Sequence, residues 1–183
     1  MITPVARHNA PVTTRLTIIR AGRADDARAI MELYRSVGAA SGGIARSPDE
    51  VTRDYVDGFV AKSLARGLLF VAEIEGLPGL AAELHAYRSE LRIFRHVLGE
   101  LTVAVHPAAQ GQGLGRELFV RLLDLVRREH PDITRVELVT QESNHRALRL
   151  YEGVGFQREG RLAGRIRQPD GTLDADIPLA WLR

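Results

Sequence analysis

The stretch from Leu101 to Glu117 constrains the fold of this chain more than any other part of the sequence. It has the pattern of a β-strand that stops at Pro107, then a glycine-rich turn, then a helix with leucines along one side. The glycines allow successive backbone N–H groups to point into one concavity, and the first turn of a helix leaves further N–H groups unpaired. A strand, a glycine turn and a helix in this order therefore predict a phosphate-binding site, although a tight turn without a ligand is the alternative.

Three phosphate-binding patterns can be compared with the segment Gln110–Gly115, which has the sequence QGQGLG. A P-loop ends in Gly-Lys-Ser/Thr, whereas Gly115 is followed by Arg116. A dinucleotide fingerprint requires GxGxxG, whereas the glycines here form GxGxG, so a nucleotide-dependent enzyme is disfavoured. The third pattern, Gln/Arg-x-x-Gly-x-Gly/Ala, is matched at Gln110, Gly113 and Gly115. It is the pyrophosphate-binding turn of the GNAT superfamily of N-acetyltransferases, which this stretch resembles.

A second motif lies further along the chain, in the segment NHRALRLYEGVGF. On a helix, Asn144, Ala147 and Tyr151 share one face, so that an amide and a phenol line the same side. The segment resembles the GNAT pattern Asn-x-x-Ala-x-x-x-Tyr-x-x-x-Gly-Phe, with the last two positions at Gly155 and Phe156. Alternatively, Tyr151 is a core residue and Asn144 a plain helix cap.

The order of elements agrees with this resemblance. Apolar periodicity and turn residues predict strands at 15–20, 67–75, 80–87, 97–105, 133–140, 156–167 and 172–182, and helices at 24–37, 47–65, 114–129 and 144–153. We expect an α/β protein (α+β mixed sheet) with the GNAT-like fold, a mostly antiparallel sheet of about seven strands flanked by four helices. Residues 1–13 are expected to be a flexible tail and residues 14–183 a single domain, with no clear pattern in 88–96.

The resemblance implies acetyl-CoA as co-substrate. The backbone between Gly111 and Arg116 would hold the pyrophosphate of coenzyme A. The backbone of Val103–Val105 would pair with the pantetheine arm as a strand edge does, and Asn144 would hydrogen-bond it. The cofactor-binding residues implied in this way are Val103, Ala104, Val105, Gln110, Gly111, Gln112, Gly113, Leu114, Gly115, Arg116, Asn144, Arg149 and Tyr151.

The same resemblance suggests the catalytic groups. Tyr151 would protonate the departing thiolate, and Glu100, at the start of the central strand, is the candidate general base. Glu83 and His85 share a face of the preceding strand and are further candidates for the base. Each of the three is otherwise a solvated or paired surface group.

Composition narrows the chemistry. The chain has no cysteine, which excludes disulfides, thiolate metal sites and a cysteine nucleophile, and no metal is expected. A direct transfer to a primary amine agrees with this, because it needs no covalent enzyme intermediate. An α-amino group, with a pKa of about 7.7–8.0, requires a weaker base than a lysine side chain near 10.4. We therefore favour a small-molecule acceptor such as an amino acid; a protein N-terminus, a lysine side chain or a non-catalytic acyl-CoA-binding module are the alternatives.

The charge pattern bears on partners and location. The formal net charge is +2, and no basic run with interleaved aromatic residues indicates nucleic-acid binding. No apolar run approaches the roughly 20 residues of a membrane span, and the first residues lack the apolar core of a secretory signal. We expect a cytoplasmic protein, and a homodimer by family resemblance alone. The loop 38–46 and the turn 168–171 are expected to flank the acceptor.

Overall fold

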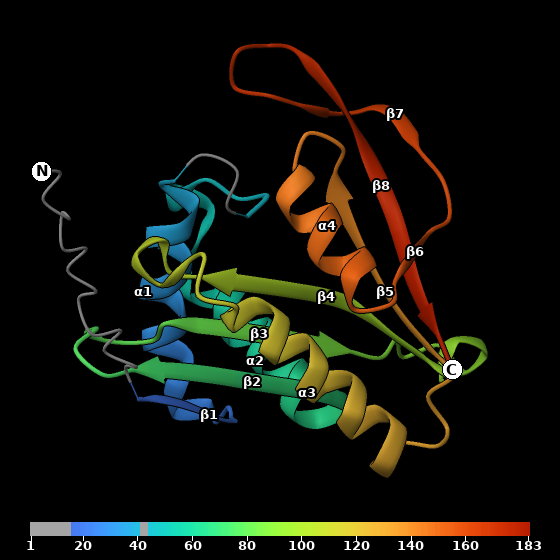
Figure 1. Cartoon of the computed structure of the whole chain (residues 1–183), viewed down its shortest axis with the longest axis horizontal. Helices are drawn as coiled ribbons and strands as arrows, with labels where there is room; N and C mark the ends of the chain where they lie inside the picture. Colours follow the sequence, from blue (N-terminus) through green and yellow to red (C-terminus); the bar gives the residue numbers. More distant parts are fainter. Residues whose placement is uncertain (1–15, 41–43) are drawn as a thin grey trace, which may run out of the picture.

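The computed structural model describes residues 16–40 and 44–183 (Figure 1). The predicted tail at 1–13 lies outside the described residues, as do residues 41–43 of the predicted acceptor loop. Four α-helices occur in the described part: α1 (Ala27–Gly38), α2 (Arg53–Arg66), α3 (Leu114–Glu129) and α4 (His145–Gly153). The strands there are β1 (Thr17–Ala21), β2 (Gly67–Ile74), β3 (Ala82–Tyr87), β4 (Val97–Val105), β5 (Arg135–Gln141), β6 (Gln157–Arg158), β7 (Leu162–Arg167) and β8 (Leu173–Leu182).

The strands form one mixed sheet in the order β1-β2-β3-β4-β5-β8-β6, and β7 pairs with the free part of β8. Among the pairs of the described structure only β4 and β5 run parallel; the others are antiparallel. Helices α1 and α2 cover one face, whereas α3 and α4 lie on the other (Figure 1). This confirms the predicted fold class, with eight strands in place of about seven.

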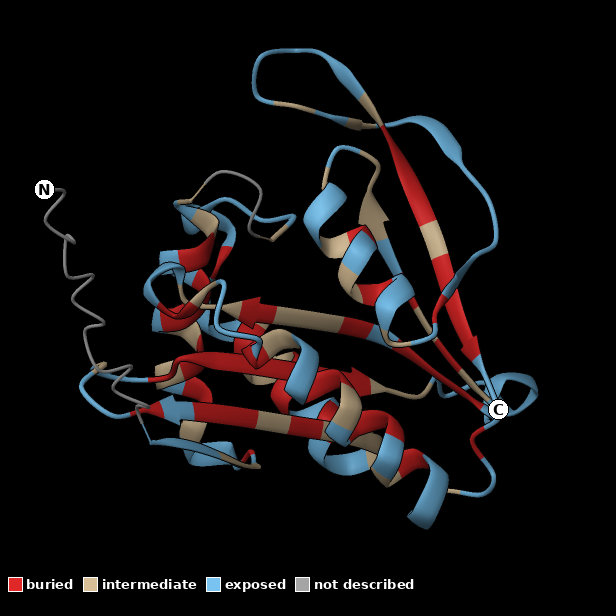
Figure 2. Cartoon of the chain, in the orientation of Figure 1, coloured by how far each residue is buried: buried red, intermediate tan, exposed pale blue. Residues whose placement is uncertain are grey.

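Two hydrophobic cores, one on each face, hold the layers together. Apolar residues of α3, including Leu118, Leu122 and Val126, pack on the same face of the sheet as those of α4. Residues of α1 and α2, such as Ile30 and Phe59, form the second core on the opposite face. Because both faces are covered, β3 is buried almost throughout (Figure 2), unlike the exposed β7.

Local details differ from the predicted elements at two places. The predicted helix from Ser47 is broken, because Pro48–Glu50 forms a 3₁₀ turn and Val51 leaves the helical conformation to become fully buried. A new helix, α2, then starts after Thr52, whose side chain caps it by accepting from Tyr55 N–H. The predicted strand 156–167 is divided into β6 and β7, so that only β7 extends along the protruding end of β8.

Candidate active site

The parallel pair β4 and β5 opens into a gap in the middle of the sheet. The two strands pair only at Val97 and Leu98 of β4, although both continue well beyond this point (Figure 1). The N–H of His106 donates to Ala81 on the β3 side. Since backbone groups alternate in direction along a strand, the N–H groups of Val103 and Val105 point the other way, into the gap. Neither pairs with a strand of the described structure, so both can donate to an extended ligand as a strand edge does.

A bulge in β4 lies at the base of this gap. Tyr87 of β3 faces Gly99, whereas His85 faces Thr102, so β4 has one residue more than its partner between these pairs. Glu100 occupies the bulge with a φ of 50°, a left-handed conformation that side chains rarely adopt. The bulge turns β4 away from β5, which is how this sequence opens its own sheet.

The glycine turn ends the gap at the C-terminal end of β4. Gly111 and Gly113 have φ values of 79° and 81°, which only glycine adopts readily, and α3 begins immediately after Gly113. Gln110 fixes the turn, since its Nε2 donates to the carbonyl of Val105 at 3.1 Å and its Oε1 accepts from Arg146 at 2.8 Å. The free N–H groups at the start of α3 then face a positively charged opening that suits phosphate groups.

A cavity of about 540 Å³ joins the gap to the glycine turn. It brings together most of the residues that the sequence assigned to coenzyme A. The residues that line it are Val37, Val103, Val105, Ala109, Gln110, Gly111, Gly113, Leu114, Gly115, Arg116, Gln141, Ser143, Asn144, His145, Arg146, Ala147, Leu150 and Tyr151. The N–H groups of β4 that face the gap lie at one end of this cavity and suit the pantetheine arm of coenzyme A. The glycine turn lies at the other end and suits the pyrophosphate.

Other assigned residues lie outside this cavity. Ala104 faces the α1–α2 core, and Gln112 turns its amide back to the Ala108 carbonyl. Arg149 is exposed and does not line the cavity, whereas Arg146, which the sequence reading missed, does. The helical repeat could have excluded Arg149 in favour of Arg146, because Arg149 lies roughly 200° around α4 from the cavity-facing Ala147.

Asn144 begins α4 and also faces the cavity. Its Oδ1 accepts from the N–H of Ala147 at 3.1 Å, so it caps the helix. The cap uses only the oxygen, and the Nδ2 remains available to donate into the cavity. The helix cap and the ligand contact are therefore compatible functions of one side chain.

Tyr151 lies on the same face of α4 as this cap, seven residues further along the chain. It is 8% exposed, packs 5.2 Å from the ring of Phe119, and lines the cavity. Burial raises the pKa of Tyr151 to about 12. Its hydroxyl makes no hydrogen bond to any residue that the structure describes, so this hydroxyl can donate to a ligand in the cavity.

The three candidates for the base lie in different surroundings. Glu100 is exposed at the bulge. Burial, the larger cause, and the negative charge of Glu100 raise the pKa of Tyr87. Glu83 and His85 are buried instead, on the face covered by α1. Glu83 accepts from the Tyr34 hydroxyl at 2.7 Å and lies 2.9 Å from Nδ1 of His85. Glu100 is therefore the one of the three that solvent reaches freely.

Aromatic residues gather on the α1–α2 side of the sheet. Phe59 stacks on His85 with ring centroids 4.0 Å apart, and Tyr55 packs on Phe59 at 5.2 Å. The guanidinium of Arg46 lies 3.9 Å from the ring centroid of Tyr55, a cation–π contact. These groups are on the α1–α2 side, whereas the cofactor cavity opens on the α3–α4 side.

Comparison with known proteins identifies the fold and the family. The sequence model of the Acetyltransferase (GNAT) family matches residues 66–156. L-amino acid N-acyltransferase MnaT of Escherichia coli is 33% identical over 140 residues, covering 75% of this chain and 78% of MnaT. The chain belongs to the GNAT acetyltransferase family. A second GNAT relative, L-methionine sulfoximine/L-methionine sulfone acetyltransferase of Salmonella typhimurium, is 33% identical over 143 residues, or 77% and 80% of the two chains.

A solved GNAT structure shows the same fold with its cofactor. The yncA protein of Salmonella typhimurium, crystallised with acetyl-CoA, superposes with a TM-score of 0.76 and 24% identity, over 91% of this chain and 93% of that one. By its family and its sequence relatives, this chain is an acetyl-CoA-dependent N-acetyltransferase, as the two sequence motifs predicted. No helix in the described part of this GNAT chain is long and apolar enough to cross a membrane.

Proposed function

We propose that this GNAT enzyme acetylates the α-amino group of an amino acid or a close analogue. The observation that carries the proposal is the similarity, over three quarters of the chain, to two enzymes whose names specify amino-acid-like acceptors. The site supports it chemically, because an α-amino group is partly unprotonated at neutral pH and needs only a weak base. A protein N-terminus shares this chemistry, but the relative whose name specifies N-alpha-acetylation matches only 32% of this chain.

The proposed reaction uses groups on both sides of the β4–β5 gap. Glu100, directly or through a water, takes a proton from the acceptor ammonium, and the free amine attacks the thioester carbonyl. The N–H groups of Val103 or Val105 polarise that carbonyl, because they point into the gap without strand partners. Tyr151 gives its proton to the departing thiolate of coenzyme A and is reprotonated by the second proton that the nitrogen loses as the amide forms. Acetyl-CoA supplies the acetyl group, and no covalent enzyme intermediate is required.

The proposed acceptor pocket lies on the α1–α2 side. Arg46 would hold a carboxylate of the acceptor by a charge-assisted hydrogen bond, and the ring of Tyr55 holds Arg46 in place. The turn 168–171 closes the protruding β7–β8 hairpin, where Arg167 donates to the Gly171 carbonyl. Arg46 and Arg167, which precedes the turn, are both exposed cations, and they suit an acceptor with a negative charge.

The direct test is release of free coenzyme A from acetyl-CoA with a panel of amines. L-amino acids, including methionine sulfoximine, should give the highest kcat/KM, and the matching α-keto acids, which lack the amine, should give none. A polyamine, an aminoglycoside or a peptide N-terminus serves as the comparison. If one of these is acetylated at least about tenfold more efficiently than any amino acid, the acceptor class proposed here is wrong.

Location and assembly belong to the same proposal. We place the enzyme in the cytoplasm, where acetyl-CoA and free amino acids are both present, and as a homodimer by family resemblance. Cell fractionation and sedimentation of the purified chain test the two points separately. Recovery in the membrane or extracellular fraction, or a monomer at assay concentration, contradicts the corresponding part.

A further inference from the structure

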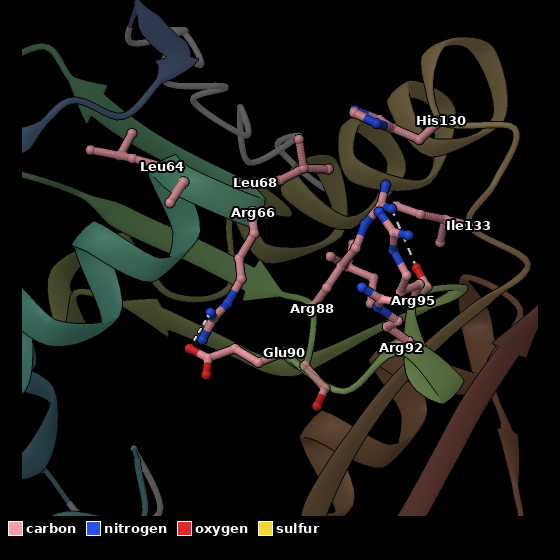
Figure 3. Close-up of a pocket in the computed structure, with 13 residues that line it drawn as sticks. Leu64, Arg66, Leu68, Arg88, Glu90, Arg92, Arg95, His130 and Ile133 are labelled. Atoms are coloured by element: carbon pink, nitrogen blue, oxygen red, sulfur yellow. Dashed lines mark hydrogen bonds and ion pairs between the residues drawn. The ribbon is translucent and has the colours of Figure 1, made fainter.

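A second cavity lies at the other end of β4 from the glycine turn (Figure 3). Its volume is about 620 Å³, and it is bounded by the end of α2, the connector between β3 and β4, and the loop between α3 and β5. None of its lining residues also lines the coenzyme A cavity. The residues around it are Leu64, Ala65, Arg66, Gly67, Leu68, Arg88, Ser89, Glu90, Arg92, Arg95, Leu98, His130 and Ile133.

The polar part of this cavity carries an excess of positive charge. Its arginines are Arg66, Arg88, Arg92 and Arg95. Arg66 is paired with Glu90, and Arg88 with Asp132 just outside the cavity. Arg92 and Arg95 form no ion pair with any residue that the structure describes. Arg92 and Arg95 are both exposed, and like charges gathered around one cavity favour the approach of an anion.

Arg66 adds an independent sign of a missing partner. Its Nε is the only buried side-chain nitrogen or oxygen in the described part of the chain that has no hydrogen-bond partner. Its Nη1 is held by Glu90, whose own side chain is 78% exposed and therefore weakly fixed. An oxyanion that replaced Glu90 could accept from Nε and Nη together, in the two-point geometry that guanidinium groups form with phosphate.

Another part of the cavity lining is apolar. Leu98 and Ile133 are buried residues of the α3-side core, and Leu68 packs against the same core. A single phosphate ion would leave most of the volume empty, since cavities of this size ordinarily hold whole organic ligands. The occupant that fits has a doubly charged oxyanion at one end and an organic body at the other.

Favourable positions at helix C-termini explain only some of the cavity arginines. Arg66 closes α2, where a cation is favourable for the helix dipole. Arg92 and Arg95 lie in the β3–β4 connector, in and directly after a short 3₁₀ turn, and no α-helix ends there. Helix capping therefore does not account for the position of these two arginines.

We propose that this cavity is a second ligand site, which binds a small phosphate monoester with its phosphoryl oxygens on the arginines and its organic part on the apolar floor. The site is separate from acetyl-CoA binding and from acetyl transfer. Because the connector leads directly into β4, a ligand here would brace the strand that also forms one wall of the active site.

The test is titration calorimetry with phenyl phosphate, at constant ionic strength, on enzyme saturated with coenzyme A. One saturable site is expected, and inorganic phosphate should bind there at least about tenfold more weakly because it makes no contact with the apolar floor. The double variant Arg92→Gln/Arg95→Gln should lose at least about tenfold in affinity for phenyl phosphate. The matched control is Arg28→Gln/Arg53→Gln, which removes two exposed arginines of α1 and α2 and should change nothing.

A further variant tests the site by a gain of affinity. Glu90→Gln removes the carboxylate that competes for Arg66, so phenyl phosphate should bind several-fold more tightly. The proposal fails if coenzyme A abolishes binding, because the phosphate then occupies the glycine turn, or if both double variants weaken binding equally, because only net charge then matters. Benzoate binding as tightly as phenyl phosphate would overturn the phosphate class.

Discussion

The Tyr34 hydroxyl lies 2.7 Å from Oε2 of Glu83, and both side chains are fully buried between α1 and the sheet. Burial, together with the Glu83 carboxylate, raises the pKa of Tyr34 well above its usual value, so the phenol remains a donor. His85, 2.9 Å from the other carboxylate oxygen, contributes the second contact. The buried acid therefore depends on these two neighbours, and α1 is tied to β3 through them.

The first prediction concerns this link. Tyr34→Phe keeps the ring but leaves one carboxylate oxygen of Glu83 without its donor, so unfolding free energy should fall by about 1–3 kcal/mol. Urea denaturation measures it. Tyr55→Phe makes the same chemical change on a neighbouring ring whose hydroxyl has no partner in the described structure, and it should cost far less. Equal losses in the two variants would mean that the link contributes nothing specific.

A second prediction concerns acid stability. The hydrogen bonds from Arg20, the largest cause, lower the pKa of Asp26 below its usual value. The folded pKa is therefore below the unfolded value of about 3.9, so the stabilisation is complete above that pH and disappears as the pH falls through the folded pKa. Asp26→Asn should cost about 1 kcal/mol at neutral pH and nothing in strong acid. The control is Asp25→Asn, which changes the exposed neighbouring residue. A cost for Asp26→Asn that does not depend on pH contradicts the assignment.

The sequence predicted much of this architecture because its signals are local. Glycine spacing fixed the turn at Gly113, and apolar periodicity fixed α3 and β4 nearly to the residue. The burial of Glu83 could not be predicted, because alternating polar residues on a strand normally indicate a solvent-facing side, and only α1 packing over that side buries them. The helix break at Val51 has the same origin. The capping box at Ser47 forms as predicted, but the helix that it starts ends where the Val51 side chain becomes buried.

Only part of the candidate site could be predicted from the sequence. The backbone of Val103–Val105 was assigned from the family resemblance, and only the pairing of β4 with β3 shows which of its N–H groups face the gap. The bulge at Glu100 could not, because no residue type there requires a left-handed φ. The Gln110–Arg146 contact joins two distant segments, and a single sequence carries no signal for such a pair.

A third prediction tests the glycine turn. Gly113→Val places a branched side chain at a φ of 81°, where it is strained, and at the mouth of the cofactor cavity. The melting shift produced by saturating coenzyme A should be lost. Gly76→Val is a matched control, because Gly76 also has a φ of 81° and open space around it, but lies in the β2–β3 turn. That variant should lose stability and retain the full shift.

A fourth prediction separates acceptor from cofactor. Arg46→Ala and Arg167→Ala should each raise KM for the amine by about fivefold or more and leave KM for acetyl-CoA unchanged, because one charge-assisted hydrogen bond contributes roughly 1.5–3 kcal/mol at most. Initial rates with each substrate varied in turn measure both constants. Arg53→Ala, on the exposed side of α2, is the control. A change confined to KM for acetyl-CoA would falsify the placement of the acceptor.

The last prediction concerns Tyr151 as the acid. Burial raises its pKa to about 12, so it stays protonated throughout any practical assay range, and kcat should show no alkaline decline from this residue below that pH. Tyr151→Phe removes the donor and keeps the ring packed against Phe119, so coenzyme A binding and stability should change little. We expect kcat to fall by at least roughly tenfold, toward the low end of the range for a general acid because a thiolate leaves fairly well unaided. Wild-type turnover in the Phe variant would make Tyr151 a core residue only, and lost cofactor binding with intact stability would make it a positioning residue.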